Sequence, residues 1–226
     1  MRTGVDLGGT KIEAVVIDDT GRVVAKQRIA TPQGEYDATV AVIASLVEAV
    51  EAKAGGGGDV LGIGVPGSPS PSTGLMRNCN STALNGKRLG EDLQQMIGRE
   101  VRMANDANCL ALSEAFDGAG AGASTVFGII LGTGVGGGVV VGNSLVAGVN
   151  GVAGEWGHIP LPWPRNDESQ CQPCWCGHQG CLETWLSGPA LEAQWIDDGG
   201  QPMTATKIAS LHPDSELMQR WIDRLA

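Results

Sequence analysis

The residues with the most distinctive chemistry are a histidine and a group of closely spaced cysteines in the second half of the chain. They are His158, Cys174, Cys176 and Cys181. One imidazole and three thiolates form a complete tetrahedral ligand set for zinc. Cys174 and Cys176 stand two positions apart, where a disulfide between them is strained but both thiolates can face one ion. The pattern predicts a structural zinc loop over residues 158–181, with Cys171 and His178 as spare ligands, and disulfides or idle thiols as the alternative.

Two glycine-containing turns between strand-like segments have the composition of phosphate-binding loops. The first contains Asp6, Gly8, Gly9, Thr10 and Lys11, and the second contains Gly132, Thr133 and Gly134. Glycine lets backbone N–H groups approach an anion closely. In the first turn the carboxylate can hold the water shell of Mg²⁺, while the hydroxyl and the ammonium group bind phosphate. Ordinary hairpin turns are the alternative, and the presence of such a turn in each half of the chain favours phosphate binding.

Asp106 stands where a strand-like segment ends and a helical segment begins. The positively polarised N–H groups of a helix start lower the pKa of a carboxylate placed there, and capping the helix is one interpretation of this residue. A catalytic base is the other interpretation. In phosphoryl transfer the transition state is loose and the hydroxyl proton moves late, so an aspartate of low pKa can still accept it.

Two further carboxylates stand beside the candidate zinc ligands. Glu155 precedes His158 by three positions, and Glu183 follows Cys181 by two. Carboxylates accept hydrogen bonds from neighbouring sugar hydroxyls, so these glutamates and the pair Asn105 and Asp106 form a candidate hexose-binding set. Turn caps or partners for lysine are the alternative roles of the glutamates.

The hydrophobic pattern predicts an α/β lobe that positions the first turn and Asp106. Glycine and aspartate turns separate three short strands over residues 3–29, which we expect to pair antiparallel. Further elements are expected as helices over residues 36–53, 89–97 and 106–116, and as strands over residues 61–65 and 101–103. Strands that alternate with helices are typical of α/β domains.

A glycine- and alanine-rich stretch over residues 118–123 predicts a domain boundary, with an N-terminal lobe of residues 1–117 and a C-terminal lobe of residues 118–226. A second strand, turn and strand begin at Val126 and repeat the pattern at the start of the chain, which suggests a duplicated lobe with a cleft between the copies. The amphipathic helix expected over residues 215–226 lacks a Gly or Asn cap. We therefore expect the second lobe to be incomplete and the chain, as part of a longer protein, to hold ATP poorly.

Composition excludes several classes of protein. The formal charge of −10 and the lack of a basic run argue against a nucleic-acid surface. The chain has no apolar run near the ~20 residues of a membrane span and no signal-peptide core, so a cytoplasmic protein without a membrane partner is expected. Thiols stay reduced in that compartment, which favours metal binding by the cysteines.

The chain resembles the ROK family of sugar kinases and sugar-responsive repressors over its whole length. Its motifs stand in the family's order at residues 6–11, 105–108, 132–134, 154–158 and 174–183. The resemblance implies an actin-like fold of two ribonuclease H-like lobes that close on a hexose and Mg-ATP, with Asp106 as the base for the 6-hydroxyl. It also implies these sugar contacts: Gly67, Asn80, Asn105, Asp106, Glu155, His158 and Glu183.

Within that family the chain looks most like the bacterial fructokinase branch, through residues 67–71, 78–82 and 160–163. Fructose is therefore the expected hexose, with ATP, Mg²⁺ and Zn²⁺ as cofactors, and we also expect a homodimer. Ala83 stands where that branch tends to carry Trp. Glucose, mannose and N-acetylhexosamines are the alternative substrates.

Two other functions are compatible with the family. A sugar-responsive repressor carries a helix-turn-helix ahead of the first lobe, whereas here the first strand is expected to start at Thr3, which speaks against this class. The other is a sugar- or zinc-binding protein without kinase activity, and turnover of ATP separates it from a kinase.

Overall fold

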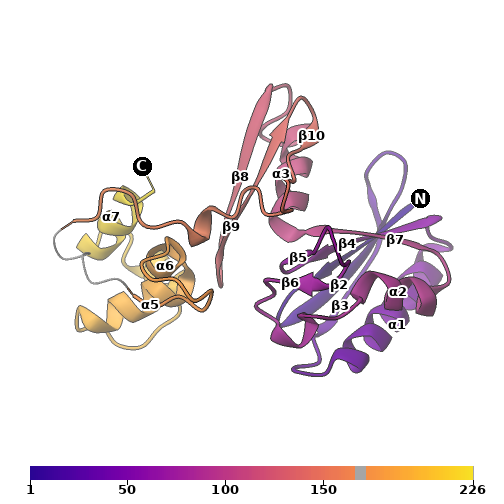
Figure 1. The fold of residues 1–226 in the computed structure, drawn as a ribbon, viewed down its shortest axis with the longest axis horizontal. Coiled ribbons are helices and arrows are strands. Elements are labelled where there is room, and N and C mark those ends of the chain that lie inside the picture. The colour runs from indigo at the N-terminus through magenta and orange to yellow at the C-terminus, as the bar shows by residue number, and fades with distance from the viewer. Residues whose placement is uncertain (166–171, 226) are drawn as a thin grey trace. The chain divides into compact units, whose positions relative to one another are not determined.

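The computed structural model describes residues 1–165 and 172–225. Their contacts divide the chain into two compact units (Figure 1), a first unit of Met1–Cys109 with Ala147–Val152 and a second unit of Leu110–Val146 with Ala153–Ala226. The chain passes from one unit to the other inside helix α3 (Asp106–Phe116). The domain boundary that the sequence suggests at residue 118 stays a prediction. Among the described residues, no helix combines the length and apolar character that crossing a membrane requires.

The first unit is built on a five-stranded sheet with the strand order β3-β2-β1-β4-β7. Its strands are β1 (Arg2–Leu7), β2 (Lys11–Ile17), β3 (Val23–Ala30), β4 (Val60–Val65) and β7 (Glu100–Asn105). The three N-terminal strands pair antiparallel, as predicted, and β4 pairs parallel with both β1 and β7. Parallel neighbours bring the carboxyl ends of β1, β4 and β7 to one edge of the sheet, where Asp6 and Asn105 lie.

Helices α1 (Tyr36–Ala54) and α2 (Leu89–Ile97) confirm the two helical patterns ahead of Asp106. Helix α1 contacts β1, β2 and β3, and α2 contacts α1 and β7, so the two helices cover one face of the sheet side by side (Figure 1). The buried stripe of α1 includes Val40, Ile43, Val47 and Val50, which recur at helical spacing. Gly55 ends α1 in the left-handed conformation, at φ 78°.

The segment between β4 and α2 folds into short elements at the edge of the sheet. They are β5 (Ser68–Pro69), β6 (Met76–Arg77) and the 3₁₀ turn η1 (Thr82–Leu84). Strands β5 and β6 pair antiparallel, and β5 also contacts β7. This segment carries Gly67 and Asn80 to the strand ends.

The second unit contains a three-stranded antiparallel sheet with the order β10-β9-β8. Its strands are β8 (Thr125–Leu131), β9 (Val135–Val141) and β10 (Ser144–Leu145), which confirms the second strand-turn-strand pattern. The later part of α3 packs on this sheet, with Ala111 and Ala115 buried against Val140. A Cβ at Gly128 would lie 2.8 Å from the Cβ of Ala111, so glycine allows this close contact.

Short helices complete the second unit. They are η2 (Trp156–His158), α4 (Glu183–Leu186), α5 (Gly188–Asp197), α6 (Ala205–Leu211) and α7 (Glu216–Asp223). The side chains of Ser187 and Ser215 cap α5 and α7 by accepting backbone N–H bonds. Helix α7 confirms the final amphipathic pattern, and residue 226 of that prediction lies outside the described residues.

Candidate functional site

The turn between β1 and β2 is held by side chains from the segment after β3. The N–H of Gly8 donates to the carbonyl of Lys11 at 2.9 Å, which closes the turn. The hydroxyl of Thr31 donates to the carbonyl of Gly8 at 2.8 Å, and the amide of Gln33 donates to the carbonyl of Gly9 at 2.6 Å. The sequence analysis did not identify Thr31 and Gln33 as residues that hold this turn. The one pattern that could have indicated them is that polar residues follow a strand expected to pair with β2.

Asp6 lies at the end of β1, with the exposed Thr10 and Lys11 a few residues further along the same turn. Burial raises the pKa of Asp6, the negative charge of Glu13 on the neighbouring strand raises it further, and Arg28 opposes both. A carboxylate, a hydroxyl and an ammonium group around one glycine turn fit a magnesium–phosphate group, because together they offer an oxygen ligand for the cation and donors for the anion.

The start of α3 is capped by Asn105. Its side-chain oxygen accepts from the N–H groups of Ala107 at 3.0 Å and Asn108 at 3.3 Å. Its amide nitrogen donates to the carbonyl of Gly67 at 3.2 Å, which links β7 to the loop after β4. Asn105 is therefore the main cap of α3, and the carboxylate of Asp106 is not required for this role.

Asp106 is exposed, and its carboxylate accepts a hydrogen bond from the N–H of Ala107 at 2.8 Å. Its pKa is raised, because desolvation by the surrounding protein and the negative charge of Asp6 outweigh the N–H bond and the side chain of Asn105. The low pKa expected from the sequence is wrong, because desolvation and the negative charge of Asp6 raise it. The structure thus brings Asp6 and Asp106 close enough to interact electrostatically.

Asn80 and Gly67 lie on the short elements beside this group. Asn80 is exposed, and its side-chain oxygen accepts from the N–H of Ser81 at 2.7 Å. A Cβ on Gly9 would lie 3.4 Å from the hydroxyl of Ser81, so this segment borders the turn between β1 and β2. The predicted residues of the first unit therefore gather at the carboxyl ends of its parallel strands, the usual ligand-binding edge of such sheets.

Gly67 has a left-handed backbone conformation that residues with a side chain rarely adopt. Its φ is +77°, and a Cβ there would lie 2.3 Å from the carbonyl oxygen of Arg77. Gly21 has a φ of +84° but nothing within 4 Å, so it offers a matched control. We expect Gly21→Ala to cost about 1 kcal/mol of unfolding free energy and Gly67→Ala about 3 kcal/mol, because the second adds a backbone collision to the same strain. Urea unfolding followed by circular dichroism measures both, and equal losses would contradict the collision.

The turn between β8 and β9 is tied to the helices of the second unit. The N–H of Gly132 donates to the carbonyl of Gly134 at 2.9 Å, and the N–H of Gly188 donates to the carbonyl of Gly132 at 2.8 Å. The carboxylate of Glu183 accepts from the N–H of Val135 at 3.0 Å. A Cβ at Gly134 would lie 2.6 Å from that carboxylate, so glycine makes room for it.

Gly154 and Gly157 also allow the segment around Glu155 and His158 to pack closely against β9. A Cβ on Gly157 would lie 2.1 Å from a carbonyl oxygen of β9, and a Cβ on Gly154 would lie 2.5 Å from another. The indole N–H of Trp156 donates to a third carbonyl of that strand at 2.7 Å. The backbone between the two glycines is therefore anchored, and both functional candidates take their places from β9.

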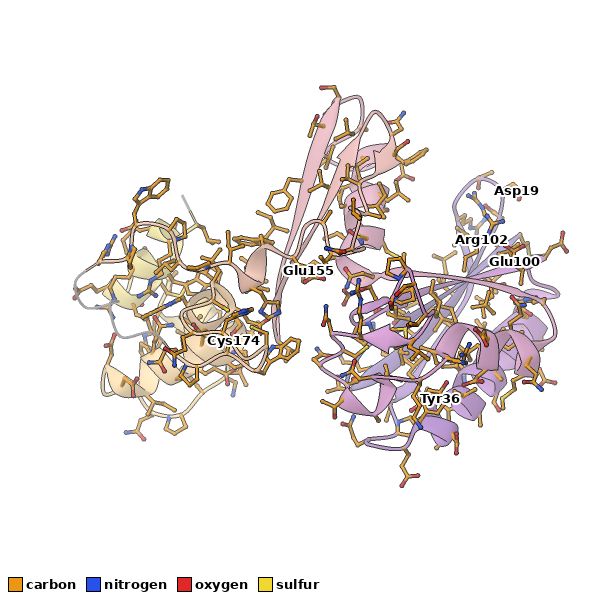
Figure 2. All side chains as sticks on the ribbon, in the orientation of Figure 1. Asp19, Tyr36, Glu100, Arg102, Glu155 and Cys174 are labelled. Atoms are coloured by element: carbon orange, nitrogen blue, oxygen red, sulfur yellow. The ribbon has the colours of Figure 1, made fainter. Side chains whose placement is uncertain are left out.

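The four predicted metal ligands come together in the second unit. The donor atoms of His158, Cys174, Cys176 and Cys181 all lie within 4.8 Å of one another. The sulfur atoms of Cys176 and Cys181 are 3.7 Å apart, and the sulfur of Cys174 is 3.5 Å from Nδ1 of His158. Around a tetrahedral zinc ion, with Zn–S distances of about 2.3 Å and Zn–N distances of about 2.0 Å, neighbouring ligand atoms lie about 3.5–3.8 Å from one another. The cluster, which includes the Cys174 labelled in Figure 2, fits zinc.

The described cysteines are free thiols, since a separation of 3.7 Å is far above a disulfide bond of about 2.05 Å. Burial raises the pKa of Cys176, but hydrogen bonds from the backbone of His178 and from neighbouring thiols outweigh it and lower the pKa to about 6. The thiolate is the form that binds metal. His178 lies 3.5 Å from Cys176 but outside the cluster, and Cys171 lies outside the described residues.

A cavity of about 410 Å³ in the second unit connects several of these residues. Its lining includes Thr133, Trp175 and Glu183. The turn over residues 132–134 and Glu183 therefore border the same space, with the N-terminus of α5 beside them.

Comparisons with known proteins give the same family along the whole chain. The sequence pattern described as "ROK family" matches residues 2–226. An N-acetyl-D-glucosamine kinase of Yersinia pestis bv. Antiqua is 39% identical over 235 residues, which cover 100% of this chain and 91% of that protein.

Two solved structures share the fold. The ROK hexokinase of Thermus thermophilus has a TM-score of 0.78 and 31% identity over 98% of this chain and 72% of that chain. A ROK family glucokinase of Streptomyces griseus, solved with glucose and AMPPNP, has a TM-score of 0.79 and 30% identity over 99% of this chain and 75% of that chain. The predicted α/β fold of the actin-like, ribonuclease H-like type is thereby confirmed.

Proposed function

Because the chain belongs to the ROK family, we propose that it is an ATP-dependent kinase that phosphorylates a hexose at its 6-hydroxyl. The observation that carries the proposal is the division of labour at the start of α3. Asn105 caps the helix, while the exposed carboxylate of Asp106 has a raised pKa beside Asp6. Such a carboxylate can accept the proton of an attacking hydroxyl. The kinases at 30–39% identity support this reaction class.

The first unit supplies the base and a phosphate turn. The oxygen of the sugar 6-hydroxyl forms a bond to the γ-phosphorus of ATP, and the bond from that phosphorus to ADP breaks. Asp106 accepts the proton of the 6-hydroxyl in this step. Thr10 and Lys11 bind phosphate oxygens, and Asp6 would hold Mg²⁺ through its water shell. When bound, Mg²⁺ neutralises charge on the transferring phosphoryl group. Gly67, Asn80 and Asn105 are proposed sugar contacts, as the family resemblance implies.

The second unit supplies further sugar contacts and the second phosphate turn. Glu155, His158 and Glu183 would accept or donate hydrogen bonds to sugar hydroxyls, and the turn over residues 132–134 would contact phosphate. Zinc is proposed on His158 and the three cysteines of the cluster. When bound, it holds the loop that carries these ligands in one conformation.

We infer N-acetyl-D-glucosamine as the preferred hexose, in place of the fructose that the motifs predict. The Yersinia relative is named for that substrate, and neither solved structure reported above is named as a fructokinase. Ala83 in η1 also supports the change, because a methyl side chain leaves more room for an acetamido group than the Trp typical of the fructokinase branch.

A hexose panel tests the proposal. Purified protein is given ATP and Mg²⁺ with N-acetyl-D-glucosamine, glucose, mannose or fructose, and ADP formation is measured. We expect kcat/KM to be highest for N-acetyl-D-glucosamine and lower by roughly 10-fold or more for fructose, a difference that a few pocket contacts can produce. A preparation from cells that lack the gene, purified in the same way, measures the activity of contaminating kinases.

A preference for fructose would contradict the substrate assignment and leave the reaction class intact. Equal rates for the wild-type and Asp106→Asn proteins would contradict the role of Asp106 as the base, and a lack of ADP formation with every hexose of the panel would contradict the kinase itself. The homodimer stays a prediction, and light scattering after size-exclusion chromatography tests it.

A further inference from the structure

Trp175 lies between two of the proposed zinc ligands and contacts two parts of the site. Its indole N–H donates to Oε1 of Glu183 at 2.5 Å. Its ring meets the ring of His158 edge-on, with centroids 5.0 Å apart and an interplanar angle of 85°. We propose that Trp175 is a positioning residue, which holds the Glu183 carboxylate in the orientation that binds the hexose. The inference rests on the proposed function, in which Glu183 is a sugar contact.

The two oxygens of Glu183 each accept a hydrogen bond from a different partner. Oε1 accepts from Trp175, and Oε2 accepts from the N–H of Val135, which begins β9 directly after the second phosphate turn. An ionised carboxylate offers about four acceptor positions, so about two remain for sugar hydroxyls. A glutamate fixed in this way gives up its rotamer freedom on folding rather than on binding, which favours ligand binding.

The exposure of Trp175 argues for this role over a packing role. Its side chain is 57% exposed, and it belongs to none of the apolar clusters formed by the described residues. A neutral indole also differs from lysine or arginine as a partner. It orients the carboxylate without neutralising it, so the negative charge stays available to strengthen bonds from sugar hydroxyls.

The contact also connects the candidate zinc cluster to the phosphate turn. Trp175 follows Cys174 in sequence and touches His158, while Glu183 binds the backbone of Val135. The cavity that Trp175 and Glu183 border also includes Thr133 of that turn. Trp175 therefore links the candidate zinc loop to Glu183 by a side-chain contact, in addition to the short backbone segment from Cys181 to Glu183.

Trp175→Phe tests the proposal, because phenylalanine keeps a ring beside His158 but has no N–H. Hexose affinity is measured by calorimetry with N-acetyl-D-glucosamine and by steady-state kinetics, and zinc by metal analysis. We expect the hexose Kd and KM to rise about 5- to 10-fold with kcat changed less than about 2-fold, as for a lost binding interaction, while zinc content is unchanged. Trp163→Phe is the matched control, since Trp163 is 93% exposed.

A double-mutant cycle with Glu183→Gln shows whether Trp175 acts through Glu183. We expect Trp175→Phe to change hexose affinity less than about 2-fold in the Glu183→Gln background, because coupled residues are not additive. The same loss in both backgrounds, a wild-type affinity in Trp175→Phe, or loss of zinc together with affinity would overturn the proposal.

A readout without hexose separates this inference from the proposed function. The indole N–H resonance of Trp175 in a ¹⁵N-labelled protein should shift in Glu183→Gln and stay in place in a Glu192→Gln control. An unmoved resonance overturns the contact. A shifted resonance in a protein that binds no hexose from the panel overturns the proposed function, and with it the sugar role of Trp175, while the contact itself stands.

Discussion

Replacing Asp106 with Asn should lower turnover by about 10²-fold or more and leave hexose affinity nearly unchanged. Asparagine keeps the size and polarity of the side chain but cannot accept a proton. Because Asn105 supplies the main cap of α3, the substitution should cost the helix little. Steady-state kinetics with the preferred hexose measures turnover, and calorimetry measures affinity.

The control is Asp59→Asn, at an exposed position just ahead of β4. It should keep wild-type turnover. Near-normal turnover in Asp106→Asn would assign Asp106 to the helix start alone, and a parallel loss of hexose affinity would point to binding rather than proton transfer.

The pH dependence of kcat/KM gives a second, independent test of Asp106 as the base. A base works only when ionised, and desolvation by the surrounding protein together with the charge of Asp6 raises the pKa of Asp106. The wild-type kcat/KM should therefore fall as the pH drops through a value above the ordinary range of aspartate. Residual activity of Asp106→Asn should lack this acidic limb, and an unchanged limb would assign it to another group.

The second large effect is expected at the metal cluster. Cys176→Ser removes a thiolate ligand, so metal analysis should fall from about one zinc per chain to nearly none. Without the ion, the loop over residues 158–181 loses the bonds that hold it, and the fluorescence of Trp175 should change because its position beside His158 is lost. The thermal unfolding temperature of the second unit should also fall, since metal binding stabilises only the folded form.

Cys109→Ser is the matched control, because Cys109 is an exposed thiol in the first unit. It should keep its zinc. Full zinc occupancy in Cys176→Ser would refute the ligand assignment. Removal of zinc from the wild-type protein with a chelator should reproduce the fluorescence change of the Cys176→Ser variant.

Local patterns in the sequence were sufficient to predict the elements and the grouping of the four candidate metal ligands. The apolar stripe of α1 and the alternation of β1 and β2 depend on neighbours a few residues away, so periodicity predicted them. Three of the four candidate zinc ligands lie within residues 174–181, where short spacing alone brings thiolates to one point. The glycines at residues 8–9 and 132–134 likewise marked turns without reference to the rest of the chain.

Tertiary structure decided what those residues contact, because the partners are distant in sequence. Thr31 and Gln33 hold the first turn from 23 and 24 residues away, and Glu183 binds Val135 from 48 residues away. The raised pKa of Asp106 depends on desolvation by the surrounding protein and on the charge of Asp6, which lies on another strand of the sheet. Spacing contains no information about desolvation or about charges on other strands, so the sequence could single out Asp106 as a candidate base but predicted its pKa shift in the wrong direction.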